Sequence, residues 1–305
     1  IRPYVRETPL DFSHELSACC AAEVYLKLEN LQYTGSFKLR GAMHYLLALS
    51  AQQREHGVVA ASSGNHGAAV AYGVHALGMQ GLVFVPSHAS PVKVAAMQRY
   101  GADIRFAGED SLEAELAARA YADQHNLAYI SPYNDALVIA GQGTIGVELL
   151  RQQSAIDTLF IAVGGGGLLA GCAAVLKAHN PRLRIIGCQP ESSAVMAHSV
   201  AAGHILDMPS HTTLSDGTAG GIEADAITFP LCREFVDEWV LVDEAQIAAA
   251  MRLIMQSHHL LIEGAAGVAV AGLLACAERM HGRKVAVVLC GANISLETLK
   301  TVLSS

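Results

Sequence analysis

One lysine in this sequence, Lys38, lies where its amine could serve as a nucleophile. It follows the stretch 34–37 (TGSF) and precedes apolar residues at helical spacing. Ser36 is a candidate N-cap, which would place Lys38 in the first turn of the helix. The partial positive charge of a helix N-terminus disfavours a cation, so the neutral amine should be favoured there. A surface lysine is the commoner explanation for any single position, but only Lys38 among the six lysines has this setting.

A second set of polar side chains follows an expected strand at residues 58–62. It has the sequence SSGNHG over residues 62–67. Small residues allow backbone N–H groups and hydroxyls to approach a ligand, and the start of a helix favours an anion. Asn65 could donate a hydrogen bond to a ring oxygen or to a carboxylate. Taken alone, the segment fits an ordinary capped turn equally well.

Four consecutive glycines at residues 164–167 come between an expected strand at 159–163 and a helix expected to begin at Leu168. Without Cβ atoms, their amides can approach a phosphate at the helix N-terminus. The same segment also fits the dinucleotide fingerprint GxGxxA, with Glu191 at a suitable distance. A lysine, a Ser/Asn loop and a phosphate cradle together predict pyridoxal phosphate, while a nicotinamide dehydrogenase is the alternative from a different class.

The composition limits the class of protein. The chain has 305 residues and a formal net charge of −8, with 52% hydrophobic and 16% charged residues. This balance excludes a disordered chain, and no apolar run reaches the roughly 18 residues of a membrane span. No cluster of Lys or Arg suggests nucleic acid as a partner. The N-terminal residues lack the apolar region of a signal peptide, and seven cysteines without a CxxC pair suggest reduced thiols, so we expect a cytoplasmic protein.

A parallel sheet must position the candidate site residues, which are Lys38 and the segments 62–67 and 164–167. Short apolar strands alternate with helical patterns along the chain, which indicates an α/β fold with crossover helices. The expected strands are 24–28, 58–62, 82–85, 103–107, 159–163, 184–189, 239–242 and 285–290. The longest irregular stretch, 203–228, is of a length that is often functional.

Five segments occur in an order that strongly resembles the serine/threonine dehydratase and serine racemase family of pyridoxal-phosphate enzymes (fold type II). They are residues 35–42 (GSFKLRGA), 62–67 (SSGNHG), 140–144 (AGQGT), 164–168 (GGGGL) and 290–293 (CGAN). The resemblance implies two open, twisted, mostly parallel sheets flanked by helices. It implies a large cofactor-binding domain (1–33 and 139–305) and a small domain (34–138) that closes over the substrate. Residues 214–223 look most like the hydroxyectoine-utilisation and phenylserine dehydratase branches.

The resemblance assigns roles to individual residues. Lys38 would form the Schiff base with pyridoxal 5'-phosphate, Phe37 would lie beside the ring, and Asn65 would bond its phenolic oxygen. The cofactor phosphate would be held by Gly164, Gly165, Gly166, Gly167 and Leu168.

The resemblance also implies a catalytic group opposite the lysine and a substrate loop. Ser63 matches the family's acid/base, and Ser62 and His66 belong to the loop that binds the substrate carboxylate. Cys290 falls where relatives place Ser or Cys against the pyridine nitrogen. A thiol cannot stabilise a protonated ring as a carboxylate would, so direct loss of a β-leaving group is favoured over transamination. We therefore expect dehydration of a β-hydroxy amino acid such as threonine or serine to a 2-oxo acid and ammonia.

Departures from the family pattern limit these expectations. Many relatives bind a divalent cation through acidic side chains where this chain has Gln189, Ser193 and Val195, so we expect this metal site to be weak or absent. Tyr133 replaces an Asn that flanks the ring in some relatives, which puts racemisation in doubt. Glu263 could act near the cofactor or cap the following helix, and both readings stay open.

Other enzymes of the same fold share parts of this pattern. Serine racemases and dehydratases of hydroxyectoine-derived or phenylserine-type substrates share the motifs. Cysteine synthases usually carry Val or Ile before the lysine, where this chain has Phe37. A dehydrogenase would leave Lys38 and the 62–67 loop unexplained. Because relatives are commonly dimers, we expect a homodimer that acts on a small amino acid.

Overall fold

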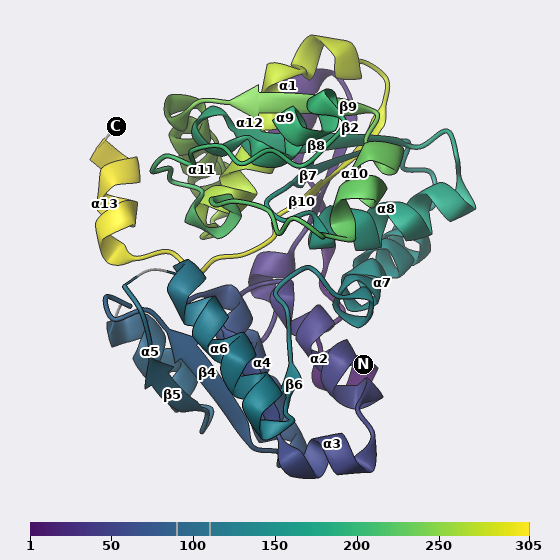
Figure 1. Ribbon diagram of the computed structural model, residues 1–305. Helices are drawn as coiled ribbons and strands as arrows, with labels where there is room; N and C mark the ends of the chain where they lie inside the picture. Colours follow the sequence, from purple (N-terminus) through teal and green to yellow (C-terminus); the bar gives the residue numbers. More distant parts are fainter. Residues whose placement is uncertain (90, 110, 305) are drawn as a thin grey trace. The chain divides into compact units, whose positions relative to one another are not determined.

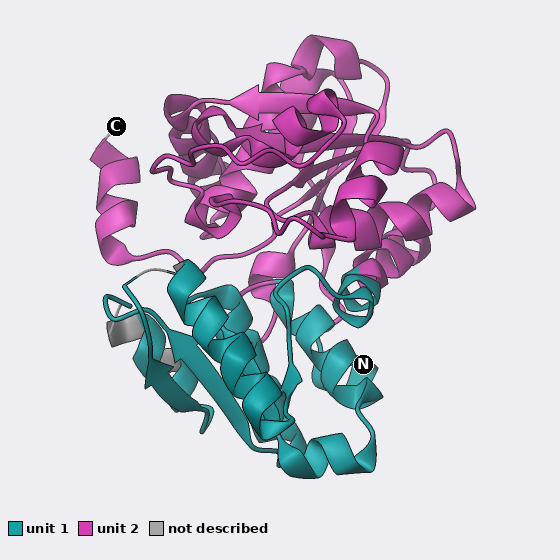
Figure 2. Ribbon diagram, viewed as in Figure 1, with its two compact units in different colours: residues 1–6, 37–142 teal, residues 7–36, 143–305 magenta. Residues whose placement is uncertain are grey.

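The computed structural model describes residues 1–89, 91–109 and 111–304 (Figure 1). The chain divides into two compact units (Figure 2). Unit 1 consists of Ile1–Arg6 and Phe37–Gln142, and unit 2 of Glu7–Ser36 and Gly143–Ser305. The sequence placed the domain boundaries after residues 33 and 138, whereas the units change over after Ser36 and Gln142. The first six residues pack with unit 1.

Unit 2 is built on a six-stranded sheet in the order β1-β2-β10-β7-β8-β9. Its strands are β1 (Leu10–Phe12), β2 (Glu23–Lys27), β7 (Thr158–Ala162), β8 (Arg184–Pro190), β9 (Glu238–Val242) and β10 (Lys284–Val288). Only β1 is antiparallel to its neighbour. All five residues of β7 are buried, as expected for a central strand covered on both faces.

The helices of unit 2 follow these strands. They are α1 (His14–Cys20), α8 (Gly167–His179), α9 (Val195–Ala202), α10 (Thr228–Phe235), α11 (Glu244–His258), α12 (Gly264–Ala275) and α13 (Leu296–Ser304). Ten residues of α12 are buried, and this helix packs on the sheet. A Cβ on Gly272 would overlap the Cys188 sulfur on β8, so glycine is needed where helix and strand meet.

Unit 1 is built on a four-stranded parallel sheet in the order β5-β4-β3-β6. Its strands are β3 (Val58–Ala61), β4 (Gly81–Val85), β5 (Asp103–Phe106) and β6 (Ala128–Tyr129), and its helices are α2 (Lys38–Ala48), α3 (Ala51–His56), α4 (Asn65–Leu77), α5 (Pro91–Gln98) and α6 (Ser111–His125). Alternate residues of β4 face opposite layers. Val83 packs with α4 and α5, and Phe84 packs with α6.

Helix α7 (Ala136–Gln152) begins in unit 1 and continues into unit 2. Its first turns lie against α2. A Cβ on Gly41 would overlap the Gln142 side chain, and a Cβ on Gly141 would lie 2.6 Å from the Gly41 Cα. The two glycines therefore allow close packing of the helix that carries Lys38.

All eight expected strands are present, which confirms the α/β prediction. The sequence missed β1 and β6, which have only three and two residues. The expected irregular stretch contains one short 3-10 turn, Asp216–Thr218. In the part of the chain that the structure describes, no helix is both long and apolar enough to cross a bilayer. Six of the seven cysteines are buried and only Cys19 is exposed.

Candidate active site

Lys38 is the first residue of α2, as the sequence predicted, but the expected cap is wrong. The N-cap residue is Phe37, and it makes no side-chain capping bond. Ser36 instead forms an antiparallel bridge with Gly291, because its backbone is held in extended form by the other chain segment. Its hydroxyl is fully buried and has no hydrogen-bond partner among the described residues. Ser36 therefore does not cap α2.

The amine of Lys38 is held by a backbone carbonyl. Its Nζ donates to the Pro132 oxygen at 2.8 Å and lies 5.3 Å from the centroid of the Phe37 ring. The segment that supplies this carbonyl is fixed locally, because the Ser131 hydroxyl accepts the backbone N–H of Asn134 at 2.9 Å. Sequence reasoning missed Pro132, because a carbonyl acceptor leaves no side-chain signal.

The 62–67 loop joins β3 to α4 within unit 1. Helix α4 begins at Asn65 with Gly64 as its N-cap, and no side chain caps it. Ser62 stabilises the loop, because its hydroxyl accepts the Gly64 N–H at 3.1 Å. A Cβ on Gly67 would overlap the Ser62 carbonyl, so the tight return requires glycine. The first amides of α4 are left without a side-chain acceptor, which suits an anion.

This lack of a cap is not general in the molecule. Helices α1, α3 and α11 begin with side-chain caps from Ser13, Ser50 and Asp243. Helices α9, α10 and α12 begin without one, and so do α2, α4 and α8 at the three predicted site segments. Their terminal N–H groups are therefore available to bound anions.

The His66 ring is buried and neutral. Its Nε2 lies 2.8 Å from the Ile130 carbonyl oxygen, so Nε2 carries the hydrogen and donates it. Burial, with a smaller contribution from the positive charge of Lys38, lowers the pKa of His66 to about 3. Its Nδ1 is a buried acceptor with no partner among the described residues. The ring anchors the loop to Ile130, two residues before the carbonyl that holds Lys38.

In unit 2, the four-glycine turn joins β7 to α8. Gly166 is the N-cap of α8, has φ +87° and makes no side-chain capping bond. A Cβ there would lie 2.7 Å from the Cys232 sulfur. A Cβ on Gly164 would lie 3.0 Å from the Thr218 Cα, in the long irregular stretch. The Thr228 hydroxyl donates to the Gly165 oxygen at 2.6 Å and fixes the turn.

Cys290 follows β10, is buried, and leads into a turn held by Glu263. The Glu263 carboxylate accepts the Asn293 N–H at 3.1 Å, and the Glu263 N–H donates to the Gly291 oxygen at 3.0 Å. Although Glu263 is the N-cap residue of α12, its side chain makes no capping bond. The helix-capping reading of this glutamate is therefore wrong.

At the position where the family resemblance suggested a cation site, Gln189 makes internal hydrogen bonds. Its amide donates to the Val163 oxygen at 3.0 Å and accepts the Ala197 N–H at 2.7 Å. The Ser193 hydroxyl pairs with that of Ser210 at 2.7 Å. Within the described residues, no group of three or more His, Cys, Asp or Glu is arranged to hold a metal ion.

Residues 1–291 match the model of the family described as pyridoxal-phosphate dependent enzymes. The chain belongs to this family of pyridoxal-phosphate-dependent enzymes. It is 37% identical to an L-threonine ammonia-lyase of Geobacter sulfurreducens, covering 99% of this chain and 75% of the relative.

Two solved structures support the same family and its fold type II. The processed form of threonine deaminase isoform 2 from Solanum lycopersicum has a TM-score of 0.95 and 34% identity, covering 99% of this chain and 89% of that chain. Maize serine racemase has a TM-score of 0.93 and 32% identity, covering 100% of this chain and 93% of that chain. Pyridoxal phosphate is thus the cofactor, and the dehydrogenase alternative is excluded.

The residues of unit 2 fit this cofactor. The glycine turn is a cradle that Cβ atoms would fill, and the amides at the start of α8 have no side-chain cap. These features suit a phosphate dianion. Lys38 lies in unit 1, on the uncapped first turn of α2, and offers the primary amine that a Schiff base needs.

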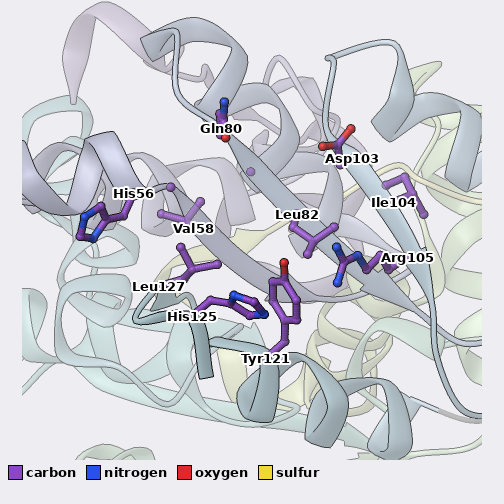
Figure 3. A pocket seen from close by; sticks show the side chains of 12 residues that line it. His56, Val58, Gln80, Leu82, Asp103, Ile104, Arg105, Tyr121, His125 and Leu127 are labelled. Carbon is purple, nitrogen blue, oxygen red and sulfur yellow. The ribbon is translucent and has the colours of Figure 1, made fainter. Parts of the chain in front are cut away.

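Unit 1 also has a pocket of about 550 Å³, which lies away from the predicted site residues (Figure 3). It is lined by the first residues of β3, β4 and β5, Val58, Gly81 and Asp103, and therefore lies at the end of the sheet opposite the 62–67 loop. Figure 3 shows Arg105 beside Tyr121, with the guanidinium carbon 4.3 Å from the ring centroid. None of the predicted site residues lines this pocket.

Proposed function

We propose that this enzyme is an ammonia-lyase that dehydrates a β-hydroxy amino acid, with threonine and serine as the first candidates. The product is a 2-oxo acid with ammonia, because the water lost in elimination is returned when the released enamine is hydrolysed. The observation that carries the proposal is the Lys38 amine, held on the Pro132 carbonyl in a family whose cofactor requires a lysine. The threonine ammonia-lyase and threonine deaminase relatives support the substrate class.

Lys38 and Ser63 are proposed to move the protons. When bound, pyridoxal phosphate withdraws electrons from the substrate Cα and makes its proton acidic. Lys38 Nζ, once released from the cofactor, removes that proton. Ser63 Oγ is the acid/base of the opposite face. His66 takes no part in proton transfer, because its low pKa keeps the ring neutral and its Nε2–H is held by Ile130.

The remaining residues bind and orient. Ser62 and the first amides of α4 would hold the substrate carboxylate, and Asn65 the phenolic oxygen of the cofactor. Gly164, Gly165, Gly166, Gly167 and Leu168 would hold its phosphate. Cys290 would face the ring nitrogen as a neutral partner and would not stabilise a positive ring. This favours elimination over transamination.

The proposal is tested by measuring 2-oxo-acid release from L-threonine, L-serine, phenylserine and the hydroxyectoine breakdown product. Release from threonine or serine supports the leading assignment, and release from only the last two supports the alternative branch. Racemisation of serine without 2-oxo acid would contradict a lyase. Lys38→Ala is the inactive control.

A second variant tests the acid/base assignment. Ser63→Ala should lower turnover of one substrate enantiomer by about a hundredfold or more, the usual contribution of such a group. Cofactor affinity should change little. An equal loss for both enantiomers would contradict the role of Ser63.

We also propose that the enzyme works as a homodimer in the cytoplasm. Support comes from the family's usual state and from seven cysteines without the spacing of a disulfide framework. Sedimentation of the purified protein at micromolar concentration tests the dimer, and a single species at 32.1 kDa would contradict it.

A further inference from the structure

Glu263 is a buried acid at the N-cap position of α12, but its side chain does not cap that helix. Only 3% of the residue is exposed. Its backbone is extended, like that of the Asp243 N-cap, yet α12 receives no bond from its carboxylate. Asp243, the N-cap acid of α11, does cap its helix and accepts the Gln246 N–H at 2.8 Å. Burying a carboxylate is costly, so another contact must account for its orientation.

That contact is the turn after Cys290. The Glu263 carboxylate accepts the Asn293 N–H, and the Glu263 N–H donates to the Gly291 oxygen. A Cβ on Gly291 would lie 2.5 Å from Glu263 Oε1. The carboxylate thus packs directly on the residue that follows Cys290, and side chain and backbone together hold the turn at two points.

The same turn is tied to the segment that leads to Lys38. Ser36 bridges Gly291, and Asn293 donates from its side-chain amide to the Thr34 oxygen at 2.9 Å. The hydroxyls of Thr34 and Ser36 are buried without hydrogen-bond partners among the described residues. In an antiparallel bridge, opposite residues project to the same face, so Ser36 projects toward the side that the Glu263 carboxylate occupies.

We propose that Glu263 is a positioning residue that holds the turn presenting Cys290 to the ring nitrogen of the cofactor and places a buried negative charge beside that turn. The inference rests on the proposed function for the placement of the ring. The thiol contributes no charge and leaves the ring nitrogen with a neutral partner, so the nearby Glu263 carboxylate instead raises the pKa of the Schiff-base nitrogen, which the visible cofactor band reports. Glu263 acts through the turn, and through its field, rather than by touching the substrate.

The test separates the shape of Glu263 from its charge. Glu263→Gln keeps an oxygen for the Asn293 N–H. The melting temperature of the cofactor-free protein should therefore be unchanged, and the cofactor affinity should stay within about twofold of wild type. Loss of the negative charge should lower the pH midpoint of the visible cofactor band by about 0.5 unit or more. Glu263→Ala removes the contact and should weaken cofactor binding about tenfold. Asp243→Asn is the matched control, because Asn caps as well as Asp, and it should change none of these values.

The outcomes distinguish the alternatives. If Glu263→Gln leaves the pH midpoint unchanged, the charge has no role and the proposal is overturned. If Glu263→Ala lowers only the melting temperature while cofactor affinity is retained, Glu263 is merely structural and the proposal is again overturned. If the band shift and affinity loss occur in an enzyme that releases no 2-oxo acid, this inference stands and the proposed function fails.

Discussion

Gly166 offers the sharpest test of the phosphate cradle, because the structure contains a matched control. Gly166 and Gly203 both have positive φ, +87° and +79°. A Cβ on Gly203 would meet nothing within 4 Å, whereas one on Gly166 would lie 2.7 Å from the Cys232 sulfur and 3.1 Å from the Thr228 Cβ. Substituting each with alanine therefore separates backbone strain from loss of space.

The expected magnitudes follow from these contacts. A left-handed conformation costs a non-glycine residue about 1–2 kcal/mol, and the reduced entropy of the unfolded chain returns about 0.4–1 kcal/mol. Gly203→Ala should thus cost about 0.5–1 kcal/mol. In Gly166→Ala, displacement of Cys232 and Thr228 adds about 1–3 kcal/mol, for a total of about 1.5–4 kcal/mol. At about 2–4 °C per kcal/mol, the melting temperature should fall several degrees further in Gly166→Ala.

Thermal unfolding of the cofactor-free protein measures this difference. The single tryptophan, Trp239, packs against Gly187 in the sheet of unit 2 and reports on that unit. Distortion of the turn should also weaken cofactor binding by up to about thirtyfold, if the helix N-terminus contributes about 2 kcal/mol to phosphate binding. Melting of the two variants within about 1 °C of each other, with unchanged cofactor affinity, would refute the reasoning.

Three further predictions address the other residues. Lys38→Ala should abolish the visible absorbance of the bound cofactor, and a retained band would rule out Lys38 as its anchor. Burial lowers the pKa of His66 in the folded protein to about 3 from its ordinary value of 6.5. The unfolded state therefore binds the proton first, and stability is lost as pH falls below about 6.5. This costs about 2 kcal/mol between pH 7 and 5, and denaturant unfolding of His66→Gln should lack that component; an equal slope in both proteins would contradict it. Chelator treatment should leave activity within about twofold, because the Gln189 amide already makes two internal hydrogen bonds at the position considered for a cation. A large loss of activity that added metal reverses would contradict this.

Local patterns in the sequence were enough to place the three strand–turn–helix segments of the site. Buried strands such as β7 read as apolar runs, and the small residues after them mark where a helix begins. For that reason Lys38, Asn65 and the glycine turn were found in the first turns or at the starts of α2, α4 and α8. These features depend on a few consecutive residues.

Such local patterns could not predict contacts between residues that are far apart in the sequence. Ser36 has the right type and place for a cap, but its backbone pairs with Gly291, far away in the chain. Glu263 could equally have capped α12, and its carboxylate instead holds the turn after Cys290. Pro132 holds Lys38 through a carbonyl that every residue possesses. Side-chain type limits which hydrogen bonds a residue can make, and the partner it takes depends on which segments the fold brings within about 3 Å of it.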